Sequence, residues 1–150
     1  MTAKPNSNRL SRDERWFAIK SLLLLQFVSI GVRLFGFSRV KHWFEQDAVR
    51  KSPAVQPLDQ SLVTAVHLGA LVRLANHRIE ALNVTCVPES LSVWWLLQRR
   101  GIPAQLQFGL RKNAGQLDGH AWVTVGDRVV SGDPLLPQDF TPIDLAKRFS

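Results

Sequence analysis

The sequence has few of the features that stabilise small proteins by covalent or metal cross-links. Only one of its 150 residues is a cysteine, so no disulfide can form within the chain, which fits a reducing compartment. His67 and His77 have no cysteine or carboxylate at ligand spacing, so a zinc site is not expected. The first residues lack the pattern of a signal peptide, and no internal repeat is present. We therefore expect a cytoplasmic protein without a metal or cofactor.

A long uncharged apolar run is also absent. Within the apolar stretch Trp16–Phe37 the longest uncharged part, Ser21 to Val32, has 12 residues, whereas a membrane span needs about 20. A buried or interfacial helix is expected instead, with a polar stripe formed by Gln26, Ser29 and Arg33. Core packing is favoured, and contact of residues 16–37 with the inner face of the membrane stays open.

The net charge of +7 is concentrated in the first third of the chain. Residues 1–51 hold ten Lys/Arg against four Asp/Glu, and residues 52–150 hold nine against eight. A basic segment beside an apolar one suits anionic lipid, nucleic acid or an acidic protein, although a solvated basic face is the commonest case. Nucleic acid is the least favoured of these partners because the sequence has no recognisable nucleic-acid-binding motif.

The order of the predicted elements indicates a single α+β domain. Residues 1–58 form a basic, apolar helical layer that ends in a proline-containing linker, and residues 59–150 form the core. The core begins with a helix from Asp59 to about Leu82, with one apolar row at Leu62, Val66, Ala70 and Leu74. A second helix starts near Cys86 and stops at Gly101. Three strands follow, at Ala104–Leu110, His120–Val125 and Arg128–Gly132.

The single cysteine stands where a thiol would be activated. Cys86 lies at the first turn of its predicted helix, where free N–H groups and the helix dipole favour a thiolate. A lone cysteine is nevertheless most often a packing residue. Position alone therefore favours packing over catalysis.

A predicted hairpin changes that balance. Gly126-Asp127 fits a two-residue turn that pairs Val125 with Arg128, and the same register pairs His120 with Asp133. The carboxylate would then orient the imidazole as a general base, which gives a Cys-His-Asp order along the chain. The rival carboxylates, Asp118 and Asp127, are interpreted as loop-forming residues.

Several motifs resemble those of one enzyme family. They are Cys86–Gly101 with its Trp-Trp-Leu-Leu, the Arg-Arg-Gly-Ile-Pro-Ala that overlaps its end, Phe108–Lys112 and His120–Val123. Together they resemble the transglutaminase-like leader peptidases of lasso-peptide biosynthesis, over about half the chain from Asn83 to Pro134. The short chain is similar to the stand-alone protease form.

The resemblance implies an α+β fold with a transglutaminase-like, papain-like core, in which a catalytic helix packs on a small antiparallel sheet. It implies a cysteine protease with Cys86 as nucleophile, His120 as base and Asp133 as acid. Its substrate would be a lasso precursor peptide, and its partners a small leader-binding protein and an ATP-dependent lasso cyclase.

Other details of such a site stay open. The Cys86 N–H is one expected oxyanion donor, and the second is Asn83, Asn76 or a backbone amide. Trp94, Trp95 and Trp122 are expected in the core, with Trp122 there or against the histidine.

Two other functions remain open. One is an acyltransferase that uses the same three residues, and the other is a non-catalytic scaffold that binds a membrane or a partner.

Overall fold

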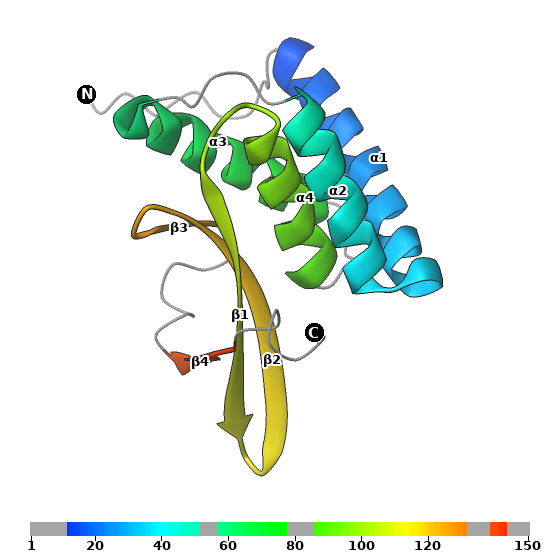
Figure 1. The fold of residues 1–150 in the computed structure, drawn as a ribbon, viewed down its shortest axis with the longest axis vertical. Helices are drawn as coiled ribbons and strands as arrows, with labels where there is room; N and C mark the ends of the chain where they lie inside the picture. Colours follow the sequence, from blue (N-terminus) through cyan, green and yellow to red (C-terminus); the bar gives the residue numbers. More distant parts are fainter. Residues whose placement is uncertain (1–11, 52–56, 78–85, 132–138, 144–150) are drawn as a thin grey trace, which may run out of the picture.

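The computed structural model describes residues 12–51, 57–77, 86–131 and 139–143. Helices come first along the chain, namely α1 (Arg12–Phe35), α2 (Phe37–Lys51), α3 (Leu58–His77) and α4 (Cys86–Gln98). Strands follow, namely β1 (Ala104–Asn113), β2 (Gln116–Val125), β3 (Arg128–Ser131) and β4 (Thr141–Pro142) (Figure 1). Helices followed by an antiparallel sheet confirm the α+β class predicted from the sequence.

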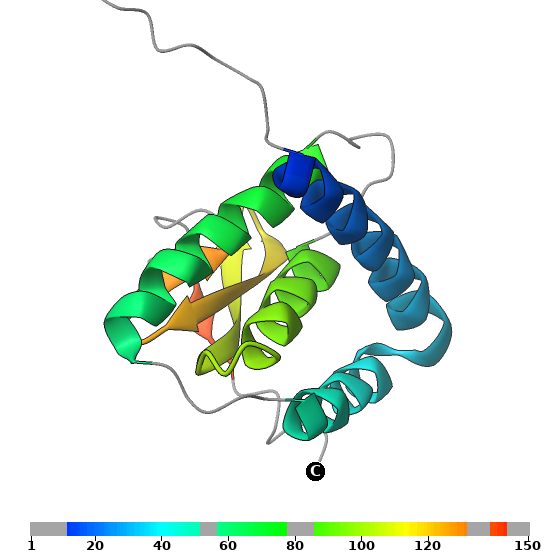
Figure 2. The ribbon, with the colours of Figure 1, turned by 90° about the horizontal axis from the view of Figure 1, so that it is seen from above.

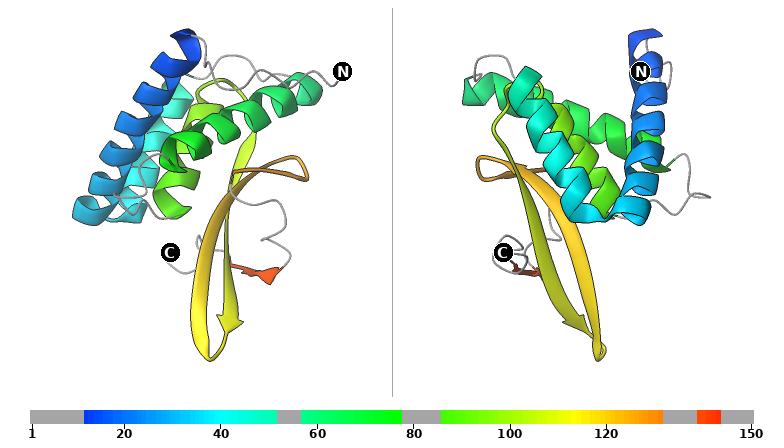
Figure 3. Two further views of the ribbon diagram at one scale, coloured as in Figure 1. Left: turned by 180° about the vertical axis from the view of Figure 1, so that it is seen from behind. Right: turned by 45° about the vertical axis from the view of Figure 1, so that its right-hand side comes forward.

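The sheet is built on one long hairpin. Its strand order is β3-β2-β1-β4, and β1 pairs with β2 from Ala104 opposite Val125 to Asn113 opposite Gln116. The turn residues Ala114 and Gly115 have φ angles of 48° and 84°, as the tightest hairpin turns require. Both strands are longer than predicted, because the exposed tip of the hairpin lacks an alternating apolar pattern. Figure 3 shows this tip extending well beyond the helices.

The helix α4 is the centre of the domain. It contacts each other helix and the strands β1, β2 and β3, and it lies between α3 on one side and α1 with α2 on the other (Figure 2). Its residues Leu91, Val93 and Leu97 are completely buried and share one core cluster with Val123 and Val125 of β2. A helix buried on most sides is held in position by the elements around it.

The helix α3 lies directly on the backbone of β3. A Cβ atom on the buried Gly69 would come within 1.8 Å of the Val130 carbonyl oxygen. Only glycine permits this approach, because every other residue would clash with a backbone atom that side-chain rotation cannot move.

A glycine also separates α1 from α2. Gly36 has a φ of 83° and donates its N–H to the Val32 carbonyl oxygen at 3.1 Å, which is a common way to end a helix. The helix α2, which lies within the predicted helical layer of residues 1–58 but had no bounds of its own in the prediction, then packs on α4. Its Phe44 stacks on Trp95 with ring centroids 4.8 Å apart.

Candidate active site

The thiol of Cys86 lies at the beginning of α4. Cys86 is the first residue of the helix and is half-buried, which confirms the predicted position. Cys86 is therefore at the N-terminal end of the helix, where the first N–H groups have no partner within the helix.

The imidazole of His120 lies on β2, opposite Gly109 of β1. Its ring packs against Trp122 and Phe140, with centroid distances of 6.2 and 5.4 Å. A Cβ on Gly109 would approach the Phe140 Cβ to 2.7 Å and the Trp122 ring to 2.9 Å, so a glycine is needed for this aromatic cluster to close. The position of Trp122 in the core and against the histidine confirms the prediction.

One ring nitrogen of His120 has an unused hydrogen-bonding capacity. Nε2 is buried and has no hydrogen-bond partner among the described residues. Buried polar atoms nearly always have a partner, and a general base needs a ring nitrogen that can take a proton.

A buried serine connects the helix of Cys86 to the strand of His120. Ser90, one turn after Cys86, donates its hydroxyl to the Ala121 carbonyl oxygen at 2.8 Å. Its Oγ also lies 3.2 Å from Oγ of Ser131, the last residue of β3. One side chain thus fixes α4 relative to both strands, beside His120 on β2. Sequence reasoning missed Ser90; a serine four residues after the nucleophile in an apolar helix was the available signal.

The described contacts include no hydrogen bond between the thiol and the imidazole. Ala121 and Val123 are buried on the face of the sheet that packs on the helices. His120 alternates with them and shares the other face with Trp122 and Phe140. Cys86 begins a helix that contacts β2, whereas the imidazole of His120 lies on the face of the sheet that points away from that helix.

The predicted acid, Asp133, lies outside the described residues. The predicted turn is confirmed, because Val125 pairs with Arg128 across Gly126-Asp127. The register then shifts by one residue at a bulge between Val123 and Thr124. The uniform register that set His120 opposite Asp133 is therefore wrong beyond this point. The assignment of Asp133 stays a prediction from the motif.

The interpretation of Asp118 as a loop residue is also wrong. Asp118 lies within β2, opposite Arg111 of β1, and accepts a hydrogen bond from the Arg111 Nη2 at 2.8 Å. A cross-strand ion pair supports extended backbone where the apolar pattern is missing. Asp118 shares a face of the sheet with His120, but its carboxylate is bound to Arg111. Asp127 does lie in a turn, as predicted.

Arg111 also holds the second aromatic neighbour of the histidine. Its guanidinium carbon lies 4.6 Å from the Phe140 ring centroid, and its Nη1 is 3.7 Å from a carboxylate oxygen of Asp139. The segment around β4 is thereby held against β1, and Phe140 against His120.

One proposed oxyanion donor already has a partner. The side-chain amide of Asn76, near the end of α3, donates to the Glu89 carboxylate at 2.6 Å. Glu89 lies in the first turn of α4, so this bond ties α3 to the helix of the nucleophile. Asn83 lies outside the described residues, and the described ranges contain no cluster of three metal-ligating side chains.

A pKa shift is found at the other end of α4. Burial and then the charge of the adjacent Arg99 lower the pKa of Arg100, which donates to the Leu96 carbonyl oxygen. Arg100 therefore caps the C-terminal end of α4, away from Cys86 at the other end of the helix.

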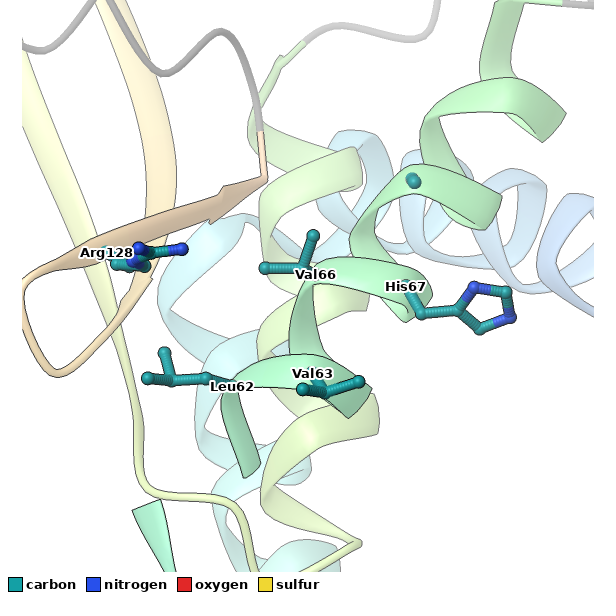
Figure 4. Close-up of a pocket in the computed structure, with 6 residues that line it drawn as sticks. Leu62, Val63, Val66, His67 and Arg128 are labelled. Carbon is teal, nitrogen blue, oxygen red and sulfur yellow. The ribbon is translucent and has the colours of Figure 1, made fainter. Parts of the chain in front are cut away.

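An apolar groove lies between α3 and the start of β3 (Figure 4). It has a volume of about 460 Å³ and is lined by Leu62, Val63, Val66, His67, Ala70 and Arg128. The predicted apolar row of α3 therefore faces outward. The face of α3 that packs on the domain is a different row, which includes Ser61, Ala65, Leu68, Val72 and Ala75.

A helix that begins at a cysteine and packs on an antiparallel sheet that carries a histidine defines the class of this protein, an α+β fold. The family model of the transglutaminase-like superfamily matches residues 27–144, more than three quarters of the chain. The chain therefore belongs to this superfamily, which contains cysteine proteases and acyltransferases. Searches of curated proteins and of solved structures give no significant match.

Proposed function

We propose that this protein is a cysteine endopeptidase that removes the leader from a lasso-peptide precursor. The observation that carries the proposal is the Ser90 bond, which joins the first turns of α4, where Cys86 begins the helix, to the backbone beside His120. Membership of the transglutaminase-like superfamily supports thiol acyl chemistry. The lasso-specific part rests on the sequence motifs, from the Cys86 helix to the His120 strand.

In the proposed reaction, His120 takes the proton from the Cys86 thiol, and the thiolate attacks the carbonyl carbon at the leader–core junction. The Cys86 N–H donates to the oxyanion that forms. The C–N bond then breaks, the amine of the core takes the proton from His120, and the leader remains as a thioester. Water, deprotonated by His120, hydrolyses the thioester and restores the thiol. Asp133 would orient the imidazole.

The proposed partners follow from this reaction. Leader removal frees an amine on the core peptide, which an ATP-dependent macrolactam-forming cyclase requires. The resemblance of the motifs supports a peptidase that acts in the cytoplasm with a separate leader-binding protein. An acyltransferase would use the same residues and differ only in the group that accepts the acyl chain.

Mass spectrometry of a lasso precursor incubated with this protein and its leader-binding partner tests the proposal. Cleavage at the leader–core junction should disappear in Cys86→Ala and His120→Ala and weaken in Asp133→Asn. His67→Ala, which removes an exposed imidazole from α3, is the matched control and should cleave normally.

Two results would contradict the proposal. Cleavage that survives Cys86→Ala would exclude thiol catalysis. A product that carries an added amine, with no hydrolysed leader, would establish the acyltransferase instead.

A further inference from the structure

The outer face of α1 is an exposed stripe of large apolar side chains. Viewed from above, α1 lies at one edge of the helix layer (Figure 2). Its exposed large apolar residues recur at steps of three and four and are Trp16, Ile19, Leu23, Phe27, Ile30 and Leu34. This spacing places them along one line that runs most of the length of the helix.

The stripe continues onto α2. The ring of Phe35, at the end of α1, packs against Trp43 of α2 with centroids 5.3 Å apart, and both are about half exposed. Large continuous apolar surfaces of this kind are rare on monomeric proteins and mark binding sites.

The charges along the length of the stripe have one sign, although Arg12, Asp13 and Glu14 precede it in the first turn of α1. Between Arg15 and Phe35, α1 carries three charged residues, Arg15, Lys20 and Arg33. All three are cationic and exposed. Long cationic side chains beside an apolar face can extend to lipid headgroups while their stems stay in the apolar layer. The charge of this face is therefore complementary to an anionic bilayer.

The buried face of α1 indicates whether this helix would lie on a bilayer or cross it. By length and composition Arg15–Phe35 is apolar enough to span, with a mean hydropathy of 1.7. However, Leu25 and Val28 are 1% exposed and belong to the core cluster shared with α4. A spanning helix would have to pull both side chains out of that core. A helix that stays packed can bury only its outer face in lipid.

We propose that the outer face of α1, extended by Phe35 and Trp43, docks this protein on an anionic lipid surface. The helix lies parallel to the membrane, with its apolar stripe among the acyl chains and Arg15, Lys20 and Arg33 at the headgroups. The groove lies between α3 and β3 (Figure 4), and Figure 2 shows the first part of α3 on the far side of α4 from α1. Docking therefore leaves that groove open to solution. The inference does not depend on the proposed peptidase activity.

Flotation of the full chain with lipid vesicles tests the proposal. The protein should float with phosphatidylglycerol-containing vesicles and much less with pure phosphatidylcholine. Leu23→Glu or Phe27→Glu should lower the partition coefficient about tenfold or more, because each removes an apolar side chain from the bilayer. The matched control is Leu117→Glu at the tip of the hairpin. Leu117 is 70% exposed and Leu23 is 66% exposed, so both changes should leave the fold intact, but only Leu23→Glu should affect binding.

The cations are tested in the same assay. Lys20→Gln and Arg33→Gln should each weaken binding to anionic vesicles about fivefold. Lys112→Gln, which removes an exposed cation from the hairpin, should leave the binding unchanged.

Four outcomes would overturn the proposal. The first is a wild-type protein that floats with neither vesicle type. The second is flotation that survives Leu23→Glu and Phe27→Glu. The third is binding that resists alkaline carbonate extraction, which would mean that α1 spans the bilayer. The fourth is a dimer that does not bind vesicles and becomes monomeric in Leu23→Glu, which would show that a second copy covers the stripe.

Discussion

The helices α1 and α4 are both strongly apolar, yet they are packed in opposite ways. In α4 even the hydroxyls of Ser90 and Ser92 are buried and hydrogen-bonded. In α1 side chains as large as Trp16 and Phe27 are mostly exposed. The comparison shows that apolar composition alone does not reveal which face of a helix meets the core. A helix held on most sides can position a reacting group, and a helix held on one side has a face free for another partner.

Removing the thiol at the start of α4 should have the largest effect. Cys86→Ala should lower precursor cleavage by about four orders of magnitude or more, since loss of a nucleophile removes the covalent pathway. Cys86 is only half-buried, so the thermal unfolding midpoint should change little. Quantitative mass spectrometry and circular dichroism measure the two effects. A large fall in the midpoint would instead make Cys86 a packing residue.

Two leucines on opposite faces of α1 test its one-sided packing. Leu25 is 1% exposed and Leu23 is 66% exposed. Leu25→Ala should therefore lower the free energy of unfolding by about 2–5 kcal/mol, and Leu23→Ala by less than about 0.5 kcal/mol. Urea denaturation of the two variants without lipid measures the difference. Equal losses would mean that the outer face of α1 is covered in solution.

Two helical glycines extend the comparison to α3. Gly69→Ala should destabilise the protein by about 3 kcal/mol, since the new Cβ would overlap a carbonyl oxygen of β3. In Gly31→Ala the nearest atom, Val40 Cγ2, would be 3.4 Å away. That substitution should stabilise the protein by up to about 1 kcal/mol through its better helix propensity. Urea denaturation measures both effects. If both variants shifted the denaturation midpoint in the same direction from the wild type, the predicted difference in packing would be contradicted.

Short-range signals predicted much of the site. Pro88 and Glu89 marked the start of α4, and Gly126-Asp127 marked the turn after β2, because both depend on neighbouring residues. The same signals put Trp122 close to His120, since residues two apart share a face of a strand.

The features that the sequence did not predict depend on contacts between segments that are distant along the chain. The bulge at Val123 and Thr124 shifts a register that a uniform hairpin would keep, and Asp118 lies in a strand because Arg111 is opposite it. The helix α2 buries only a narrow row, and the apolar row of α3 faces outward. Which face of a helix is covered depends on its neighbours in space, which periodicity does not specify.

The smallest effect predicted separates two serines of α4. Ser90→Ala would leave the Ala121 carbonyl without this bond and should cost about 1–3 kcal/mol. Ser92 donates to the Pro88 carbonyl oxygen within its own helix, so Ser92→Ala should cost less. Ser90→Ala should also lower kcat for precursor cleavage more than KM, because the bond sets α4 against the strand of His120. If the two variants cleave equally fast, the contact from Ser90 to Ala121 stabilises the fold without positioning the nucleophile.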